Sequence, residues 1–256
     1  MRLAAFVAVA ALAASVGAAA ARTAQTELPP LPRIAPACVE ADFASARRNV
    51  RARLCMSTPS AQRVPAVIVL HGCGGFGTLD QTLAKRLPEH GIATDYVDYF
   101  GSTAPPGPQG FCNAHAAVRR AFPTWLRIVR DATRALEHTQ GIDPQRVGAI
   151  GWSLGGGITL VAAERYPKLF SALVLFSAAA FGPVLREVNR LPPTLVLSGG
   201  SGDIVPVSDA IALYHALRLH RVTAELHVYP HGNHQWKHAQ FDAGLRWTLA
   251  FLGRHL

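Results

Sequence analysis

VGAIGWSLGGG, residues 147–157, is an apolar strand pattern that runs directly into Gly-x-Ser-x-Gly and then into a helical stretch rich in alanine. This combination is typical of a nucleophile elbow, the tight strand-to-helix turn that exposes a serine hydroxyl above a parallel sheet. Gly151 and Gly155 carry no side chains that would collide where the strand and the helix nearly touch. The serine also stands at the start of the helix, where free N–H groups and the helix dipole favour developing negative charge. Ser153 is therefore the candidate nucleophile.

Strands and helices alternate on both sides of this turn. Strands are expected at residues 50–56, 64–70, 92–99, 147–150, 172–176, 194–198 and 224–228. Helices are expected at about 78–90, 116–139, 154–166, 208–220 and 240–252, the second of which is apolar at helical spacing. Alternating strands and helices predict an α/β fold with a mostly parallel central sheet flanked by helices.

The chain has 256 residues, of which 50% are hydrophobic, and this length predicts one folded domain. Residues 1–21 combine an early Arg2, an apolar run and small residues at the end, which is typical of a secretory signal peptide. A membrane anchor is disfavoured because the apolar run is shorter than the roughly 20 residues that span a bilayer. We therefore expect export to the periplasm or the exterior, no integral membrane segment after cleavage, a lead-in over 22–49 and a catalytic domain over 50–256.

The formal net charge is +9, with 25 basic and 16 acidic residues. The arginines are scattered along the chain, whereas a nucleic-acid-binding protein would concentrate them with aromatic residues on one face. No nucleic-acid partner is expected, and the charge is interpreted as a solvated basic surface. Attraction to anionic polymers or to the cell envelope stays open as an alternative.

The four cysteines are an even number, which in an exported chain suggests two disulfides. Three pairings satisfy this number, and the preferred one joins Cys38 to Cys55 and Cys73 to Cys112. The second pair would tie together two loops near the candidate nucleophile. The spacings typical of zinc ligands are absent, so no metal site is expected.

A serine nucleophile needs a base, and the base needs an acid that orients it. Asp203 follows the expected strand 194–198, and His234 follows the expected strand 224–228. Both residues would therefore lie at the carboxyl edge of the sheet, in the chain order serine, acid, histidine that this type of fold uses. His231 competes for the role of base, but His234 is preferred and His231 is interpreted as a loop histidine.

The tetrahedral intermediate of acyl transfer needs two preset N–H donors. One is expected from the amide of Leu154, the residue after the nucleophile. The other is expected from the glycine-rich loop 71–75, at the backbone of Cys73, with Gly74 as the alternative. His71 is expected to hold this loop by hydrogen bonds. A mechanism based on the Cys73 thiol is disfavoured because the neighbouring glycines suit backbone contacts.

Together these residues resemble the dienelactone hydrolase family of the α/β-hydrolase superfamily, over roughly residues 60–252. The matching pieces are Leu70–Gly75, Asp98, Gly151–Gly156, Gly202–Pro206, and Tyr229–Pro230 followed by His234. The resemblance implies an α/β-hydrolase fold, activity on small esters or lactones, and no separate lid domain. In agreement, only the 17 residues 177–193 connect the strands between which lids are commonly inserted.

One departure from the family pattern bears on the substrate. Dienelactone hydrolases proper carry a cysteine at the elbow, whereas this chain has Ser153, which favours general serine-esterase activity over the dienelactone substrate. The elbow also resembles that of prolyl-oligopeptidase-type peptidases, but there is no room for their propeller domain. Polyester-degrading relatives of cutinases share the elbow but lack the His-Gly-Cys-Gly-Gly loop.

The sequence thus predicts an exported serine esterase that acts through an acyl-enzyme, needs no metal or organic cofactor, and is a monomer or associates weakly. Three enzyme alternatives stay open: a peptidase, an acyltransferase with the same triad, and a polyester-degrading, cutinase-like hydrolase. A degenerate hydrolase that only binds a partner is the non-enzyme alternative. Four aromatic residues are candidates either to line the pocket or to pack in the core: Phe76, Phe100, Trp152 and Trp236.

Overall fold

The computed structural model of the chain describes residues 37–57, 62–101, 103, 105–107, 109–179 and 188–256. The predicted signal peptide over residues 1–21 lies outside the described residues, as does the first part of the predicted lead-in.

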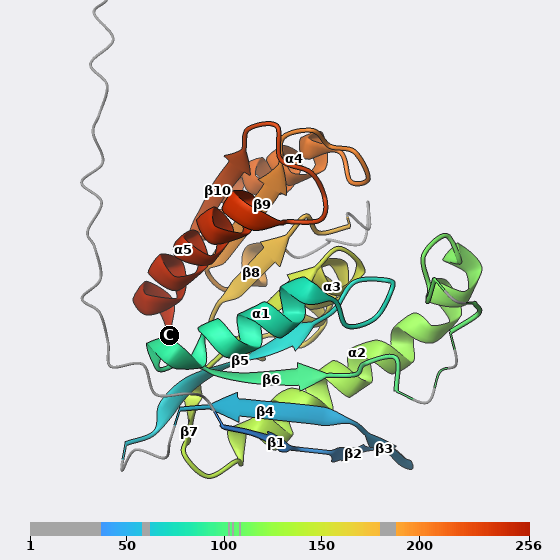
Figure 1. Ribbon diagram of the computed structural model, residues 1–256, viewed down its shortest axis with the longest axis vertical. Helices are drawn as coiled ribbons and strands as arrows, with labels where there is room; N and C mark the ends of the chain where they lie inside the picture. The colour runs from blue at the N-terminus through green and yellow to red at the C-terminus, as the bar shows by residue number, and fades with distance from the viewer. Residues whose placement is uncertain (1–36, 58–61, 102, 104, 108, 180–187) are drawn as a thin grey trace, which may run out of the picture. The chain divides into compact units, whose positions relative to one another are not determined.

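The described residues form an eight-stranded sheet with the strand order β1-β4-β6-β5-β7-β8-β9-β10 (Figure 1). All pairings from β6 to β10 are parallel, whereas β4 is antiparallel to both of its neighbours. The prediction of a mostly parallel sheet is therefore confirmed. In chain order the strands are β1 (Ala37–Glu40), β4 (Ala52–Met56), β5 (Val64–Leu70), β6 (Ala93–Val97), β7 (Ile142–Trp152), β8 (Leu173–Phe176), β9 (Thr194–Gly199) and β10 (Ala224–Tyr229).

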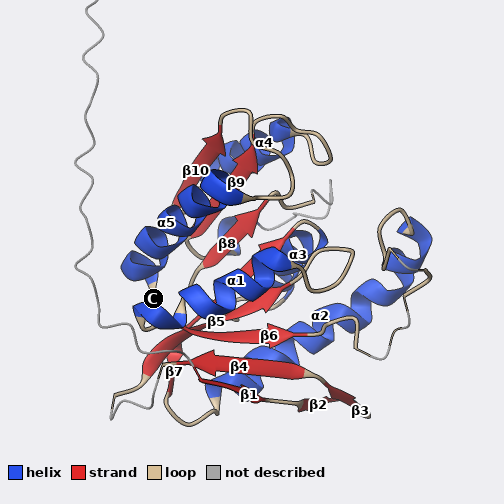
Figure 2. Ribbon diagram, in the orientation of Figure 1, coloured by secondary structure: helices blue, strands red, loops and turns tan. Residues whose placement is uncertain are grey.

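Helices cover both faces of this sheet, as Figure 2 shows. One face packs against α1 (Thr78–Arg86) and α5 (His238–His255), whose buried residues share a core cluster with Val67, Val69 and Ile150. The other face packs against α2 (His115–Glu137), α3 (Leu154–Arg165) and α4 (Val207–Leu219). Both faces of the central strands are therefore buried, which explains why their sequences are continuous apolar runs.

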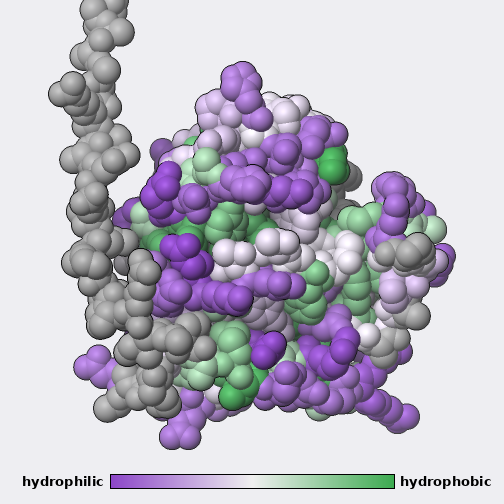
Figure 3. Space-filling view, in the orientation of Figure 1, coloured by the Kyte–Doolittle hydropathy of each residue, from purple (hydrophilic) through white to green (hydrophobic). Residues whose placement is uncertain are grey.

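Large apolar side chains lie mainly inside. On the face drawn in Figure 3, hydrophilic residues cover most of the described surface, and hydrophobic residues form smaller groups between them. The exposed large hydrophobic residues are Val39, Phe76, Ile204, Ile211 and Leu219. None of the described helices is both long and apolar enough to cross a bilayer.

Two predicted elements differ from the structure. The helix expected over 78–90 ends at Arg86 and continues as the 3₁₀ turn η1 (Pro88–His90), because Pro88 has no N–H with which to extend the helical hydrogen bonds. Strand β7 begins at Ile142, five positions before the strand expected from Val147. The extension was not predictable because residues 143–146 are three polar residues and a proline. A second 3₁₀ turn, η3 (Val188–Arg190), precedes β9.

The sheet extends beyond the predicted boundary at residue 50. Strand β1 pairs with β4, while β2 (Phe43–Ser45) and β3 (Arg48–Val50) form a separate two-stranded sheet. All four residues of β1 are exposed, so this edge strand has none of the apolar alternation that marks a strand in a sequence. The lead-in therefore contributes a strand to the central sheet.

Both preferred cysteine pairings are confirmed. Cys38 and Cys55 stand opposite each other on β1 and β4 and form a disulfide. Cys73 and Cys112 form the second disulfide, between the loop after β5 and the loop before α2. The described chain has no free cysteine.

Asp95 is a charged residue in the middle of β6, with 4% of its surface exposed. One of its carboxylate oxygens, Oδ1, has no hydrogen-bond partner among the described residues, and burial raises the pKa of Asp95 to about 7. The native state therefore binds this proton more tightly than the unfolded chain, in which the pKa is near 3.8. The stability that protonated Asp95 contributes is therefore complete below pH 3.8 and is lost as the pH rises to about 7.

The free energy of unfolding of Asp95→Asn is therefore expected to increase relative to that of the wild type as the pH rises. This relative gain reaches about 4 kcal/mol once Asp95 is ionised in the wild type. Urea unfolding of both proteins at about pH 5 and about pH 8 measures this difference. An identical difference at the two pH values would show that Asp95 does not titrate in this range.

Candidate active site

Ser153 occupies a sharp turn between β7 and α3. Its backbone angles are φ 54° and ψ −116°, a conformation that is sparsely populated for a residue with a side chain. The turn is held by the end of β8, because the Ser153 N–H donates to the Phe176 carbonyl at 3.0 Å. The Ser153 carbonyl in turn accepts hydrogen bonds from the N–H groups of Gly157 and Ala179, at 3.1 and 2.9 Å. The strained backbone is thus fixed on both sides of the serine.

The strand before Ser153 and the helix after it approach β5 very closely. A Cβ atom on Gly155 would lie 2.2 Å from the Leu70 carbonyl oxygen and 2.5 Å from that of His71. Only glycine fits this position, and it brings the start of α3 against the end of β5. The first turn of α3 has N–H groups without partners inside the helix, and they begin at Leu154.

The site lies where the order of strands reverses. From β5 the chain crosses to β6 on one side, and from β6 it returns past β5 to β7 on the other side. The loops after β5 and β7 therefore diverge at the carboxyl edge of the sheet, and Leu70 stands beside Gly151 in the pairing register. A crevice at such a switch point is the usual place for a ligand in an open α/β sheet.

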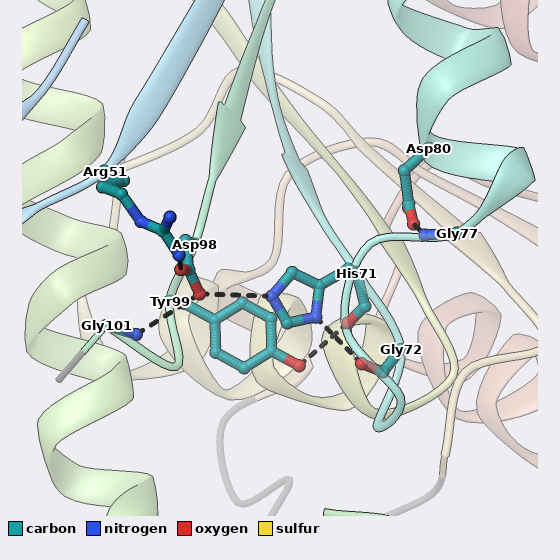
Figure 4. A network of polar contacts seen from close by, with 8 residues as sticks. All are labelled: Arg51, His71, Gly72, Gly77, Asp80, Asp98, Tyr99 and Gly101. Carbon is teal, nitrogen blue, oxygen red and sulfur yellow. Dashed lines mark hydrogen bonds and ion pairs between the residues drawn. The ribbon is translucent and has the colours of Figure 1, made fainter. Parts of the chain in front are cut away.

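The glycine-rich loop after β5 is braced by His71, whose side chain is buried (Figure 4). Its Nδ1 lies 2.9 Å from the Gly72 carbonyl oxygen, and the Tyr99 hydroxyl donates to the His71 carbonyl at 2.8 Å. The imidazole stacks on the Tyr99 ring at 4.3 Å, with Phe76 and Phe100 against it edge-on. The expectation that His71 holds this loop by hydrogen bonds is confirmed.

A charged pair lies behind His71. Its Nε2 is 3.9 Å from Asp98 Oδ1, and Asp98 Oδ2 accepts a hydrogen bond from Arg51 at 2.8 Å (Figure 4). Burial raises the pKa of Asp98, but His71 and Arg51 outweigh this effect, so the pKa lies below its ordinary value. Asp98 is therefore a carboxylate that attracts the imidazole from the side opposite Gly72.

Asp203 and His234 lie together on the loops after β9 and β10. Asp203 Oδ1 accepts a hydrogen bond from the backbone N–H of His234 at 2.9 Å and a longer one from Ser201 Oγ at 3.3 Å. The His234 side chain is 6% exposed, whereas His231 is exposed to solvent. Burial lowers the pKa of His234 below its ordinary value of 6.5, and the Asp203 carboxylate opposes this shift. His234 is thus held as a neutral imidazole near neutral pH.

The predicted triad is not joined through its side chains in this structure. The buried Nδ1 of His234 has no hydrogen-bond partner among the described residues, and Asp203 reaches His234 only through the backbone. No hydrogen bond within the described part of the chain joins Ser153 Oγ to the His234 ring. In enzymes, hydrogen bonds between catalytic groups are often long or poorly aligned before substrate binds.

Trp152, at the end of β7, connects the glycine-rich loop with the loop after β10, a role that sequence reasoning missed. Its Nε1–H donates to the His234 carbonyl at 3.1 Å, and its ring lies 3.0 Å from where a Cβ on Gly72 would stand. The residues it joins are far apart in the chain, so no local pattern could have indicated these contacts. Of the other aromatic candidates, Phe100 and Trp236 are buried in the core, and Phe76 is 42% exposed.

Trp152→Phe is expected to lower kcat for any reaction at this site about 5- to 10-fold with little change in KM, because the ring still packs on Gly72 but the hydrogen bond to the His234 loop is lost. Steady-state kinetics of the purified variant measures this effect. The matched control is Trp247→Phe on α5, whose indole stacks on His227. An equal loss of kcat in both variants would contradict a specific role for Trp152.

The sheet is mostly parallel, and its strand β7 leads into the strained turn at Ser153 beside the switch point. This arrangement defines the α/β-hydrolase fold. The chain belongs to the dienelactone hydrolase family, whose sequence model matches residues 51–243.

Solved structures and a curated protein resemble the chain over different shares of its length. A dienelactone hydrolase-like promiscuous phosphotriesterase from metagenomic libraries superimposes with a TM-score of 0.77 at 16% identity, over 86% of this chain and 99% of the other. A dienelactone hydrolase from Anabaena variabilis gives 0.67 at 20% identity, over 86% and 99%. An uncharacterized protein of Mycobacterium tuberculosis is 32% identical over 56% of this chain and 54% of its own length. The chain thus spans about half the length of that curated relative.

Proposed function

We propose that the chain is an exported serine esterase that cleaves small carboxylic esters or lactones through an acyl-enzyme on Ser153. The observation that carries the proposal is the strained backbone of Ser153 at the start of α3, at the switch point of the sheet. Strain of this kind is retained where the surrounding structure enforces it, which is typical of catalytic turns. Its position next to the free amides of a helix suits a nucleophile that generates an oxyanion.

The remaining roles follow from the chemistry of acyl transfer. His234 removes the proton from Ser153 Oγ as the oxygen attacks the ester carbonyl, and Asp203 orients the imidazole and stabilises its positive form. The backbone amides of Cys73 and Leu154 donate hydrogen bonds to the oxyanion of the tetrahedral intermediate. His234 then gives the proton to the leaving alcohol and activates the water that releases the acid. The lowered pKa of His234 favours its role as a base near neutral pH.

Two exposed apolar residues suit the proposed type of substrate. Phe76 follows the glycine-rich loop directly, and Ile204 follows Asp203 directly. Phe76 also packs edge-on against His71, so an exposed apolar side chain borders the glycine-rich loop and suits a substrate with a hydrocarbon group near the ester. Export is supported by the leader-like residues 1–21 and by two disulfides, which persist in oxidising compartments.

Hydrolysis of p-nitrophenyl esters of short acids tests the proposal. The purified oxidised protein is expected to release p-nitrophenol, and Ser153→Ala at equal concentration is expected to show only the background rate. Equal rates for the two proteins would exclude Ser153 as the nucleophile. A wild-type protein that is folded but inactive on every short ester would favour a binding protein or a different acyl acceptor.

A further inference from the structure

Cys73 carries one of the two proposed oxyanion donors, and the inference in this subsection rests on that proposed function. The Cys73 N–H belongs to the peptide unit whose carbonyl is that of Gly72. This carbonyl accepts one hydrogen bond from His71 Nδ1 at 2.9 Å (Figure 4) and another from the Gly75 N–H at 3.1 Å. Because the N–H and C=O of a trans peptide point in opposite directions, these bonds set the orientation of the Cys73 N–H, while the position of Cys73 depends on its other contacts.

The other side of Cys73 is held by the turn Gly110–Cys112, which precedes α2. The Cys73 carbonyl accepts a hydrogen bond from the Phe111 N–H at 2.7 Å, and the Cys73 side chain is bonded to Cys112. Gly110 allows this close approach, because a Cβ on it would lie 2.3 Å from the Cys73 carbonyl oxygen. Gly110 also has a φ of +65°, a backbone conformation that favours glycine. The turn therefore contacts Cys73 through both its backbone and its side chain.

This turn is itself anchored in the core. Phe111 is 2% exposed, and its ring packs against Phe100 at 4.5 Å and against Trp125 of α2 at 4.8 Å. The Phe111 carbonyl accepts the Ala114 N–H at 3.1 Å, just before α2 begins. Movement of the turn would therefore require movement of the buried aromatic cluster, and Cys73 is tied to a rigid part of the fold.

We propose that Cys112 is a positioning residue for the proposed esterase reaction and that its bond to Cys73 holds the Cys73 amide where the oxyanion forms. The glycine-rich loop contains three glycines among residues 71–75, which allow its backbone many conformations unless contacts hold it. The hydrogen bonds from His71 and Gly75 orient one peptide of Cys73, and the Gly110–Cys112 turn fixes the residue from the other side. Without the bond to Cys112, the loop samples conformations in which the N–H no longer meets the oxyanion.

The second disulfide provides a matched control. Cys38–Cys55 joins neighbouring strands at the edge of the sheet, and the strand order separates β4 from β5 by β6. It closes a shorter loop, with a sequence separation of 17 compared with 39 for Cys73–Cys112. Both bonds constrain the unfolded chain, so loss of either is expected to lower the stability. Only the loss of Cys73–Cys112 is expected to change the chemistry.

The test compares C73S/C112S with C38S/C55S in the hydrolysis of p-nitrophenyl acetate. The first variant keeps the backbone N–H of residue 73, and its kcat is expected to fall about 10- to 100-fold, with KM changing less than about twofold. The second is expected to keep the wild-type kcat. Each kcat is expressed per active site, counted by labelling with a fluorophosphonate, so that partial unfolding does not enter the comparison. A wild-type kcat in C73S/C112S, or an equal fall in both variants, would overturn the proposal.

If C73S/C112S does not fold, Gly110→Ala decides the question with both disulfides intact. The added methyl group pushes the turn away from the Cys73 carbonyl, so kcat is expected to fall at nearly constant KM, and unchanged kcat would overturn the proposal. Wild type and Ser153→Ala are measured in the same assay. If Ser153→Ala is inactive but C73S/C112S and Gly110→Ala keep the wild-type kcat, only the positioning role is refuted. If Ser153→Ala keeps the wild-type activity, the proposed function itself is refuted.

Discussion

Replacement of Ser153 with alanine is expected to lower kcat for ester hydrolysis by about 10⁴- to 10⁶-fold, with the fold unchanged. The hydroxyl oxygen Oγ is the atom that would carry the acyl group in the proposed acyl-enzyme. Alanine suits the site because Ser153 is buried and its side chain makes none of the hydrogen bonds that hold the turn. The residual rate would come from the oxyanion donors and substrate binding alone.

The combination with His234→Ala sharpens this test. Nucleophile and base act as one unit, so S153A/H234A is expected to be no slower than Ser153→Ala alone. Ser171→Ala, at the opposite end of β8, is the matched control and is expected to keep full activity. Additive losses in the double variant would show that His234 acts independently of Ser153. A loss of less than about tenfold in Ser153→Ala would rule out covalent catalysis by this residue.

Asp203→Asn is expected to lower kcat by about 10³- to 10⁴-fold. Asparagine retains an oxygen that can accept the His234 N–H, so the contact between the two loops at 2.9 Å is kept. The negative charge is lost, and with it the stabilisation of the imidazolium that forms during the reaction. The variant therefore separates the electrostatic role of Asp203 from its structural role.

The pH profile gives a second signature of Asp203. The lowered pKa of His234 predicts that kcat/KM rises with pH, with a midpoint below 6.5 in the wild-type protein. Asp203 raises this pKa, so Asp203→Asn is expected to move the midpoint to still lower pH. Asp209→Asn, at the start of α4, makes the same change of charge and is expected to leave the midpoint in place. A shift in both variants would indicate a general effect of charge.

Most of the sheet could be predicted because its strands are buried on both faces and are separated by glycine-rich or polar loops. The candidate nucleophile, acid and base could be proposed because parallel strands end at one edge, so residues far apart in sequence share a location. The edge strand β1 could not be predicted, since all of its residues are exposed and its pairing with β4 depends on the tertiary fold.

Within the site, contacts between loops were not predictable from the sequence. The hydrogen bond from Trp152 to the His234 carbonyl and the one from Phe111 to the Cys73 carbonyl involve backbone acceptors. Every residue carries such an acceptor, so the residue types indicate neither partner. The preference for Cys73–Cys112 indicated that two loops meet near the site, but not that Gly110 packs directly on Cys73.

Covalent labelling with a fluorophosphonate, followed by peptide mass spectrometry, tests directly whether Ser153 is the activated nucleophile. A single modification on Ser153 is expected, with slower labelling in His234→Ala and no labelling in Ser153→Ala. Labelling at another residue, or equal labelling of Ser153→Ala, would contradict the assignment of Ser153 as the activated nucleophile.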